Sequence, residues 1–296
     1  MSQTPLVSIL MSSYNYGRFL RDAIDSALAQ TYPQIEVIVV DDGSTDDSPA
    51  IIASYGNRIV PILKFNGGQA SAFNAGFAAS KGEILCLLDS DDVFAANKID
   101  RVVGQFASHP LAGWLFHSVR TFSANGEGEL LADYASMNGE QDFRETVKGG
   151  KLSFIAPPTS GLCFRRELLS RILPMPEATT ILLSDHYLKF CAAGLSPGLV
   201  WNEALSMLRV HEHNAYTLQK NNSAKRAQIL AETAFALRQR WPEFRKFANH
   251  CFAYSRASLS RGAQKDRAAD RYLSTATVAE RVDIWLRAQY LRMFSI

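Results

Sequence analysis

Two apolar segments of the sequence end abruptly in aspartates. Residues 36–47 read Glu-Val-Ile-Val-Val-Asp-Asp-Gly-Ser-Thr-Asp-Asp, and residues 83–92 read Glu-Ile-Leu-Cys-Leu-Leu-Asp-Ser-Asp-Asp. In open α/β sheets, ligands bind outside the carboxyl ends of the strands. Because two such strands can border one crevice, the pattern predicts an acidic site for a metal ion and a polar ligand.

The second segment ends in a pair of aspartates with a spacing suited to a cation. Side chains repeat every second residue in an extended segment, so Asp89 and Asp91 lie on the same side of the chain. Carboxylate oxygens are ligands that Mg²⁺ and Mn²⁺ prefer, and either ion can neutralise phosphates. The Gly-rich phosphate loops of dinucleotide enzymes and P-loop NTPases are absent from the sequence. The spacing lets one aspartate bind a cation and the other a ribose hydroxyl, so a diphosphate could be held without such a loop.

The elements that would position these aspartates alternate along the first ~90 residues. Apolar runs predict strands at 6–11, 35–40, 59–64 and 84–88. Helical periods follow at 18–30 and 69–80, and Asp46 or Asp47 can cap a further helix between them. The βαβαβ order predicts an α/β fold with a doubly wound, mostly parallel sheet flanked by helices.

The pattern is less regular from about residue 113 onward. Strands are expected at 114–121, 160–164 and 198–210, helices at 165–172 and 185–193, and a stretch rich in loops and glycines at 123–150. From residue 223 the periodicity predicts helices to the end of the chain, interrupted at Trp241-Pro242 and Gly262.

Charge and cysteine content indicate the broad class of protein. The net charge of the 296 residues is only +2, but residues 238–296 hold 12 Lys or Arg against 5 Asp or Glu, a local charge of +7. The four cysteines form no C-x-x-C pair, which predicts reduced thiols in the core. No apolar run approaches the ~18 residues of a membrane span, and no signal peptide is seen. We therefore expect a cytoplasmic protein with no nucleic-acid partner; contact with the inner face of a membrane is an open alternative.

The sequence resembles a family-two glycosyltransferase of the GT-A fold. The resemblance rests on Asp41-Asp42-Gly43-Ser44 and Asp89-Ser90-Asp91-Asp92, within blocks at 7–15, 38–46, 76–84 and 88–92. It is close over 5–100, looser over 155–215 and unspecific beyond 222. It implies an inverting, Mn²⁺- or Mg²⁺-dependent transfer from a nucleotide-diphosphate sugar, UDP being the expected nucleotide. The acceptor would be a hydroxyl of a glycan or a lipid-linked saccharide, as in polysaccharide biosynthesis of the cell envelope.

The resemblance also implies roles for residues near the first two strands. Ser12 and Tyr14 would line the base pocket, and Asp42 would accept a hydrogen bond from a uracil-type N3–H. Asn74 would face the phosphates, although an Asn in a small-residue helix can serve packing alone. The alternative for Asp41 and Asp42 is a turn or helix cap built on Asp-Gly chemistry.

The same resemblance places the metal site between distant segments. Asp91 would bind the metal, and Asp89 would contact the ribose or assist the metal. Residues 208–214 resemble the family's Tyr-Arg-x-His segment, with Leu208 in the tyrosine's place. His211 would complete the metal and diphosphate site, because imidazole binds Mn²⁺ well, and His213 competes for that role.

A general base is implied at Asp185, within Ser184-Asp185-His186-Tyr187. A hydroxyl is a poor nucleophile until its proton is removed, and a positioned base contributes about 10²–10⁴ in rate. Asp185 could instead cap the helix that follows. The family more often has Glu-Asp here, so Ser184 departs from the pattern.

These observations divide the chain into three parts. Residues 1–112 form the nucleotide-sugar-binding half, 113–221 the acceptor-binding and catalytic half of the same GT-A domain, and 222–296 a C-terminal helical extension. Two other functions stay open at this point: a nucleotidyltransferase, which shares a related fold, and a catalytically idle sugar-nucleotide-binding scaffold.

The last predicted helix has one apolar face with arginines outside it. Val282, Trp285, Leu286, Tyr290 and Met293 share this face. A basic amphipathic helix can rest on an anionic lipid leaflet. The pattern more commonly marks a helix packed on its own protein or on a dimer partner, and we expect that here.

Overall fold

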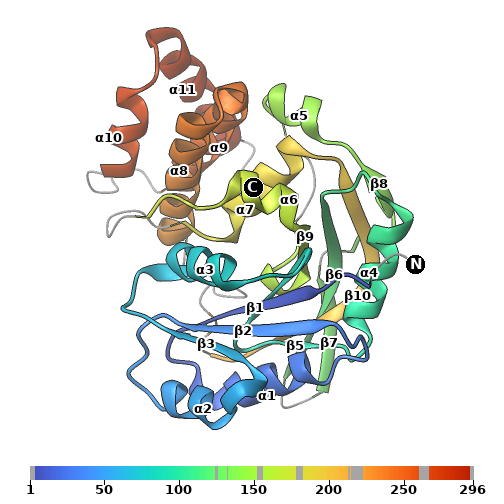
Figure 1. The fold of residues 1–296 in the computed structure, drawn as a ribbon. Helices are drawn as coiled ribbons and strands as arrows, with labels where there is room; N and C mark the ends of the chain where they lie inside the picture. The colour runs from blue at the N-terminus through green and yellow to red at the C-terminus, as the bar shows by residue number, and fades with distance from the viewer. Residues whose placement is uncertain are drawn as a thin grey trace. The chain divides into compact units, whose positions relative to one another are not determined.

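The computed structural model describes residues 4–123, 126–131, 133–151, 156–177, 183–212, 214, 223–259 and 267–293 (Figure 1). The chain divides into two units. Unit 1 consists of Met1–Asp142, Ile155–Glu177 and Leu195–His211, and unit 2 of Phe143–Phe154, Ala178–Gly194 and Glu212–Ile296. The division at 112 and 221 expected from the sequence stays a prediction.

The described part of unit 1 is built on a ten-stranded sheet with the order β3-β2-β1-β4-β9-β6-β10-β5, in which β7 pairs with β6 and β8 with β10. The strands are β1 (Val7–Ser13), β2 (Ile35–Asp41), β3 (Val60–Leu63), β4 (Ile84–Asp89), β5 (Val93–Phe94), β6 (Trp114–Ser123), β7 (Gly126–Leu131), β8 (Gly139–Gln141), β9 (Leu162–Arg165) and β10 (Gly198–Arg209).

The first four strands are parallel, so their carboxyl ends meet at one edge of the sheet. Ser13 of β1 pairs with Asp41 of β2, and Ser12 pairs with Asp89 of β4. Beyond β4 the sheet is mixed: β9 is antiparallel to β4 and β6, whereas β10 is parallel to β6. The predicted α/β fold is confirmed, and the parallel arrangement that it named holds for β1–β4 and the β6–β10 pair.

Helices cover both faces of the parallel strands, as a doubly wound sheet requires. The helices of unit 1 are α1 (Gly17–Leu28), α2 (Ser48–Ser54), α3 (Gly68–Ala79), α4 (Lys98–Ser108) and α6 (Arg166–Ile172). Val37 and Val39 of β2 pack in one core with α1, α2 and α4, whereas Ile38 and Val40 pack with Ala72 of α3. Alternate side chains of one strand therefore enter opposite layers.

The stretch at 123–150, expected to be rich in loops, also contains regular structure that the sequence pattern did not predict. It holds β7, β8 and the short helix α5 (Arg144–Lys148). β7 forms an antiparallel hairpin with the preceding strand β6, whereas β8 pairs with β10, which comes much later in the sequence. Short Gly-containing strands carry little signal of their own, because their pairing partners stabilise them.

Unit 2 is helical in its described part. It contains α5 and α7 (Asp185–Leu195, ending at the unit boundary), followed by α8 (Ser223–Arg240), α9 (Arg245–Ser258), α10 (Arg267–Ser274) and α11 (Val278–Met293), drawn in orange to red in Figure 1. The predicted break at Pro242 is confirmed as a 3₁₀ turn, Pro242–Phe244, between α8 and α9. Gly262 lies outside the described residues.

Two further expectations can be compared with the fold. All four cysteines are free and buried, which confirms them as core thiols. Among the helices that the structure describes, none has both the length and the apolar character of a membrane span.

Candidate active site

Three carboxylates gather where β4 ends. Asp89 is the last residue of the strand, and the amide of Asp92 donates to the carbonyl of Asp89 at 3.1 Å, closing a turn that carries Asp91. The chain stops pairing here because the turn directs it away from β1. The acidic strand end predicted from the sequence is therefore present in unit 1.

Asp91 faces His211, a residue 120 positions later in the sequence. The distance from His211 Nε2 to Asp91 Oδ2 is 3.1 Å, and both side chains are largely buried. The other ring nitrogen, Nδ1, lies 3.4 Å from Nη2 of Arg18. An arginine can only donate, so Nδ1 accepts and Nε2 carries the proton that points to Asp91. The structure thus brings together the two residues that the sequence assigned to the metal.

This pair can be tested for its fit to a divalent cation. A carboxylate oxygen and an imidazole nitrogen that face each other are suitable donors, and a cation held by both would replace the proton on Nε2. Among the described residues, no group of three His, Cys, Asp or Glu side chains is arranged to hold a metal. A cation here would take further ligands from water or from a substrate's phosphates, as Mg²⁺ commonly does.

Aromatic rings hold His211 in place. Its ring centroid lies 4.6 Å from that of Phe19 and 5.8 Å from that of Tyr16. Burial, with the charges of Asp91 and Asp89, raises the pKa of Tyr16 to about 12. The electrostatic field of the carboxylates in the turn therefore acts on the Tyr16 hydroxyl.

Behind the turn lies a buried polar network centred on Ser160. Its hydroxyl accepts from the amide of Asp89 at 3.1 Å and donates to Oδ2 of Asp92 at 2.5 Å. Its carbonyl accepts from Nζ of Lys98 at 2.7 Å and from the hydroxyl of Ser206 at 2.6 Å. Ser160 thus joins the acidic turn to α4 and β10.

Lys98 and Asp92 are opposite charges in this network, and both are almost fully buried. Burial lowers the pKa of Lys98, and burial with the neighbouring Asp91 and Asp89 carboxylates raises that of Asp92. The Lys98 ammonium also lies 3.4 Å from the centre of the Phe94 ring. The two side chains are joined through Ser160, whose carbonyl accepts from Lys98 and whose hydroxyl donates to Asp92, so loss of either side chain removes a buried hydrogen bond.

We expect Asp92→Ala to lower the free energy of unfolding by about 1–3 kcal/mol, because the Ser160 hydroxyl and the Arg209 amide lose a buried acceptor. Asp92→Asn should cost less, since it keeps the volume and one acceptor. Urea denaturation of both variants measures this, with Asp270→Ala on the exposed side of α10 as a control. Losses below about 1 kcal/mol in both variants would show that the network adds little to stability.

Arg209, the last residue of β10, links the segment that carries His211 to the acidic turn and to α1. Its amide donates to Oδ1 of Asp92 at 3.0 Å, and its Nε donates to the carbonyl of Asp91 at 3.0 Å. Nη2 donates to Asp22 of α1 at 2.7 Å. The position of His211 is therefore coupled to the acidic turn through one side chain.

Asp42 is buried and already has three partners. Oδ1 accepts from Nζ of Lys64 at 2.6 Å and from the amide of Gly67 at 3.0 Å, and Oδ2 accepts from the amide of Gly68 at 2.7 Å. Asp41 accepts from the amide of Ser44 at 3.0 Å, the turn role weighed for it above. The base contact of Asp42 stays a prediction, and it would use the remaining lone pair of Oδ2.

The other nucleotide residues predicted from the sequence lie in two places. Ser12 is near the end of β1, directly opposite Asp89, and Tyr14 follows in the turn with 47% of its surface exposed. Asn74 of α3 instead donates to the carbonyl of Met175 at 2.9 Å, accepts from its amide at 2.7 Å and also contacts Glu177. This matches the packing alternative for Asn74, and its phosphate contact stays a prediction.

Asp185 belongs to unit 2, where it begins α7. Its Oδ2 lies 2.5 Å from Nζ of Lys189 and its Oδ1 lies 3.2 Å from Nδ1 of His186. Burial raises the pKa of Asp185, but the Lys189 ammonium and His186 outweigh that effect and hold it well below its usual range. The carboxylate is therefore ionised at neutral pH, the state in which it can accept a proton, although the ion pair weakens its basicity.

Several residues of this site were not found from the sequence. Lys98 begins an amphipathic helix, where a lysine is normally solvated, so no pattern indicated its burial. Ser160 lies within residues 155–215, where the resemblance is looser, and it had no assigned role. His213, the competitor of His211, lies outside the described residues.

Known proteins resemble this chain in sequence. Residues 8–173, more than half of the chain, match the family model described as Glycosyl transferase family 2. A glycosyltransferase of Nostoc sp. (strain PCC 7120) is 36% identical over 215 residues, which cover 70% of this chain and 66% of that protein. The chain spans less than two thirds of that relative, and at most 31% of the Rickettsia glycosyltransferases that it also matches.

Solved structures resemble the chain in fold. TarS 1–349 of S. aureus in complex with UDP-GlcNAc has a TM-score of 0.61 at 19% identity, covering 96% of this chain and 79% of that one. The mannosyltransferase PcManGT of Pyrobaculum calidifontis, in complex with GDP-Man and Mn²⁺, has a TM-score of 0.55 at 19% identity, covering 98% and 81%. These likenesses confirm the GT-A type fold.

Proposed function

The chain belongs to glycosyl transferase family 2, and from this premise we propose that it transfers a sugar from a nucleotide-diphosphate sugar to a hydroxyl acceptor. The proposed donor nucleotide is UDP, and the acceptor is a glycan or a lipid-linked saccharide. The transfer inverts the anomeric centre and depends on Mn²⁺ or Mg²⁺.

The observation that carries this proposal is the pair formed by Asp91 and His211 at the end of β4. Their facing atoms are 3.1 Å apart, and the rings of Phe19 and Tyr16 orient the imidazole. An incomplete protein ligand set suits a cation that arrives with a diphosphate. The solved structures with UDP-GlcNAc and with GDP-Man and Mn²⁺ support the same class of donor.

In this proposal Asp91 and His211 would hold the cation, which would supply positive charge to neutralise the departing diphosphate. Asp89 contacts the ribose. Asn74 can face the phosphates only if its hydrogen bonds to the Met175 backbone break. Ser12, Tyr14 and Asp42 surround the base at the ends of β1 and β2. The network under the acidic turn holds Asp89 and Asp91 in position before the donor arrives, so their part of the binding costs less ordering entropy.

Asp185 is the proposed general base. The acceptor oxygen bonds to the anomeric carbon while the bond from that carbon to the diphosphate oxygen breaks, and the acceptor proton passes to Asp185. The ionised state of Asp185 supports this role. Because attack and departure occur on opposite faces of the sugar, the anomeric configuration inverts.

A donor panel tests the proposed function. With UDP-glucose, UDP-GlcNAc, UDP-galactose or GDP-mannose in Mn²⁺, we expect slow release of nucleoside diphosphate from at least one donor and none after chelation by EDTA. Release of pyrophosphate from a nucleoside triphosphate would favour a nucleotidyltransferase. Binding without release, even with candidate acceptors added, would favour the idle scaffold.

A further inference from the structure

Helix α11 presents an apolar face to solvent. Six of its large apolar side chains are between 52% and 77% exposed: Val278, Val282, Trp285, Leu286, Tyr290 and Met293. We call these six residues the α11 face. From the sequence we expected this face to pack on the protein or on a dimer partner. In the described structure the buried residues of α11 are instead Ile284 and Ala288, on the opposite side of the helix. The helix packs on α9 through that opposite side.

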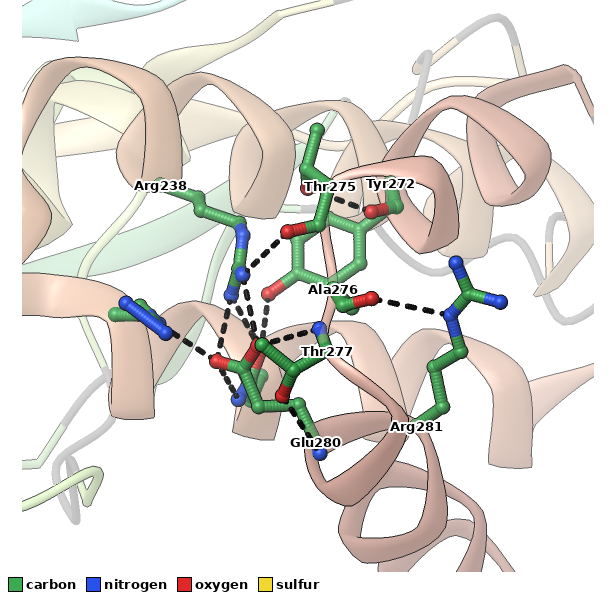
Figure 2. Close-up of polar contacts among 9 residues, drawn as sticks. Arg238, Tyr272, Thr275, Ala276, Thr277, Glu280 and Arg281 are labelled. Atoms are coloured by element: carbon green, nitrogen blue, oxygen red, sulfur yellow. Dashed lines mark hydrogen bonds and ion pairs between the residues drawn. The ribbon is translucent and has the colours of Figure 1, made fainter.

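The N-terminus of α11 fixes this orientation. Glu280 accepts from both terminal nitrogens of Arg238, at 3.1 and 2.9 Å, and from Nε of Arg245 at 2.7 Å (Figure 2). Thr277 and Glu280 also form a capping box, in which each amide donates to the other side chain. The first turn of α11 is thus tied to α8 and to the start of α9.

Two further contacts act along the helix. Nε of Arg281 donates to the carbonyl of Ala276 at 3.1 Å (Figure 2), and Arg292 donates to the carbonyl of Arg256 on α9 at 2.7 Å. Rolling α11 to bury its apolar face would break these bonds and expose Ile284. The outward direction of the α11 face is therefore built into the polar contacts of unit 2.

The surroundings of this face are basic. At 3.6 residues per turn the face spans roughly 140° of the helix and includes no charged residue, with Arg281 and Arg292 at one border and Asp283, which pairs with Arg287, at the other. Over the described residues of α8–α11 and their connections, 12 Lys or Arg stand against 5 Asp or Glu, a net charge of +7. An uncharged apolar stripe with Trp and Tyr inside a basic surface has the composition of a helix that lies in the headgroup region of a bilayer.

We propose that the α11 face docks on an anionic lipid bilayer. Trp285, Leu286 and their neighbours would enter the headgroup boundary, while the basic residues around them meet anionic headgroups. A second copy of the chain is the less suited occupant, because two surfaces of charge +7 repel each other at close range. The inference does not depend on the proposed transferase activity.

Vesicle co-sedimentation of the full chain tests this proposal. With vesicles of phosphatidylcholine containing about one-third phosphatidylglycerol, at physiological salt, we expect the chain to sediment, and to sediment less with phosphatidylcholine alone. The double variant Trp285→Ser/Leu286→Ser should bind at least about tenfold more weakly, because two large apolar side chains leave the interface. Leu111→Ser, which removes an 81% exposed leucine of unit 1, is the matched control and should bind like the wild type.

A spectroscopic readout follows the same face. The fluorescence of Trp285 should shift to the blue on adding anionic vesicles, and Trp285→Phe should lose that shift. A wild type that stays in the supernatant, or a double variant that sediments equally, would overturn the proposal. So would a dimer in sedimentation equilibrium that the double variant abolishes, without vesicle binding, since the occupant would then be a second copy.

Discussion

Asp91→Ala is expected to abolish Mn²⁺-dependent binding of UDP and to lower the rate of sugar transfer by at least about 10²–10³-fold. The physical reason is that Asp91 supplies the carboxylate of a site in which the protein offers few ligands, so His211 alone cannot hold the cation. Calorimetric titration of UDP with and without Mn²⁺ measures the binding. A donor-hydrolysis assay measures the rate.

Two variants make this result interpretable. Asp91→Asn keeps the shape and an acceptor for His211 but removes the charge, so it should lose Mn²⁺-dependent binding while remaining as stable as the wild type. Asp270→Ala removes an exposed carboxylate from α10 and should change neither quantity. If Asp91→Ala binds UDP with Mn²⁺ as tightly as the wild type, Asp91 is not part of the site.

Asp185→Asn should retain nucleotide affinity but lose transfer by about 10²–10⁴-fold, because the amide cannot take the acceptor's proton. Full transfer in this variant would mean that another group is the base. Single-turnover transfer to an acceptor, measured beside UDP affinity, separates the two effects.

The variant Lys189→Met tests the role of Asp185 through the pH dependence of the transfer rate. Lys189 is the charge that most lowers the pKa of Asp185, so removing it should raise that pKa. Activity needs the ionised carboxylate, so it is lost as the pH falls through the pKa of Asp185. The acid limb of the rate profile should therefore move to higher pH in Lys189→Met. An unmoved limb would show that Asp185 does not control it.

The parallel half of the fold was predictable because its signals are local. β2 and β4 are short continuous apolar runs, and α1 carries a clear helical period before β2, so strand, helix and their order follow from neighbouring residues. The acidic strand ends then predict a site through the geometry of parallel strands alone. β8 was missed because its pairing with β10 is a distant contact, and β7 was missed because a short strand with two glycines has a weak pattern even in a hairpin with β6.

Within the site, residue types were easier to predict than partners. Asp91 and His211 were placed together through the resemblance, but neither Lys98 under the turn nor Lys64 on Asp42 follows from any spacing. Burial of a lysine depends on the complete packing of α4 against the sheet. The periodicity of α11 gave the correct apolar face but not its exposure, because Glu280 and its arginine partners decide which side of the helix is turned inward.

The central claim is that the acidic turn after β4 binds a nucleotide through a divalent cation. Anomalous diffraction from crystals grown with UDP and Mn²⁺ tests this claim most directly. The account predicts an anomalous manganese peak within about 2.5 Å of a carboxylate oxygen of Asp91, with diphosphate oxygens among its other ligands. A nucleotide bound with its manganese away from Asp91 would contradict it.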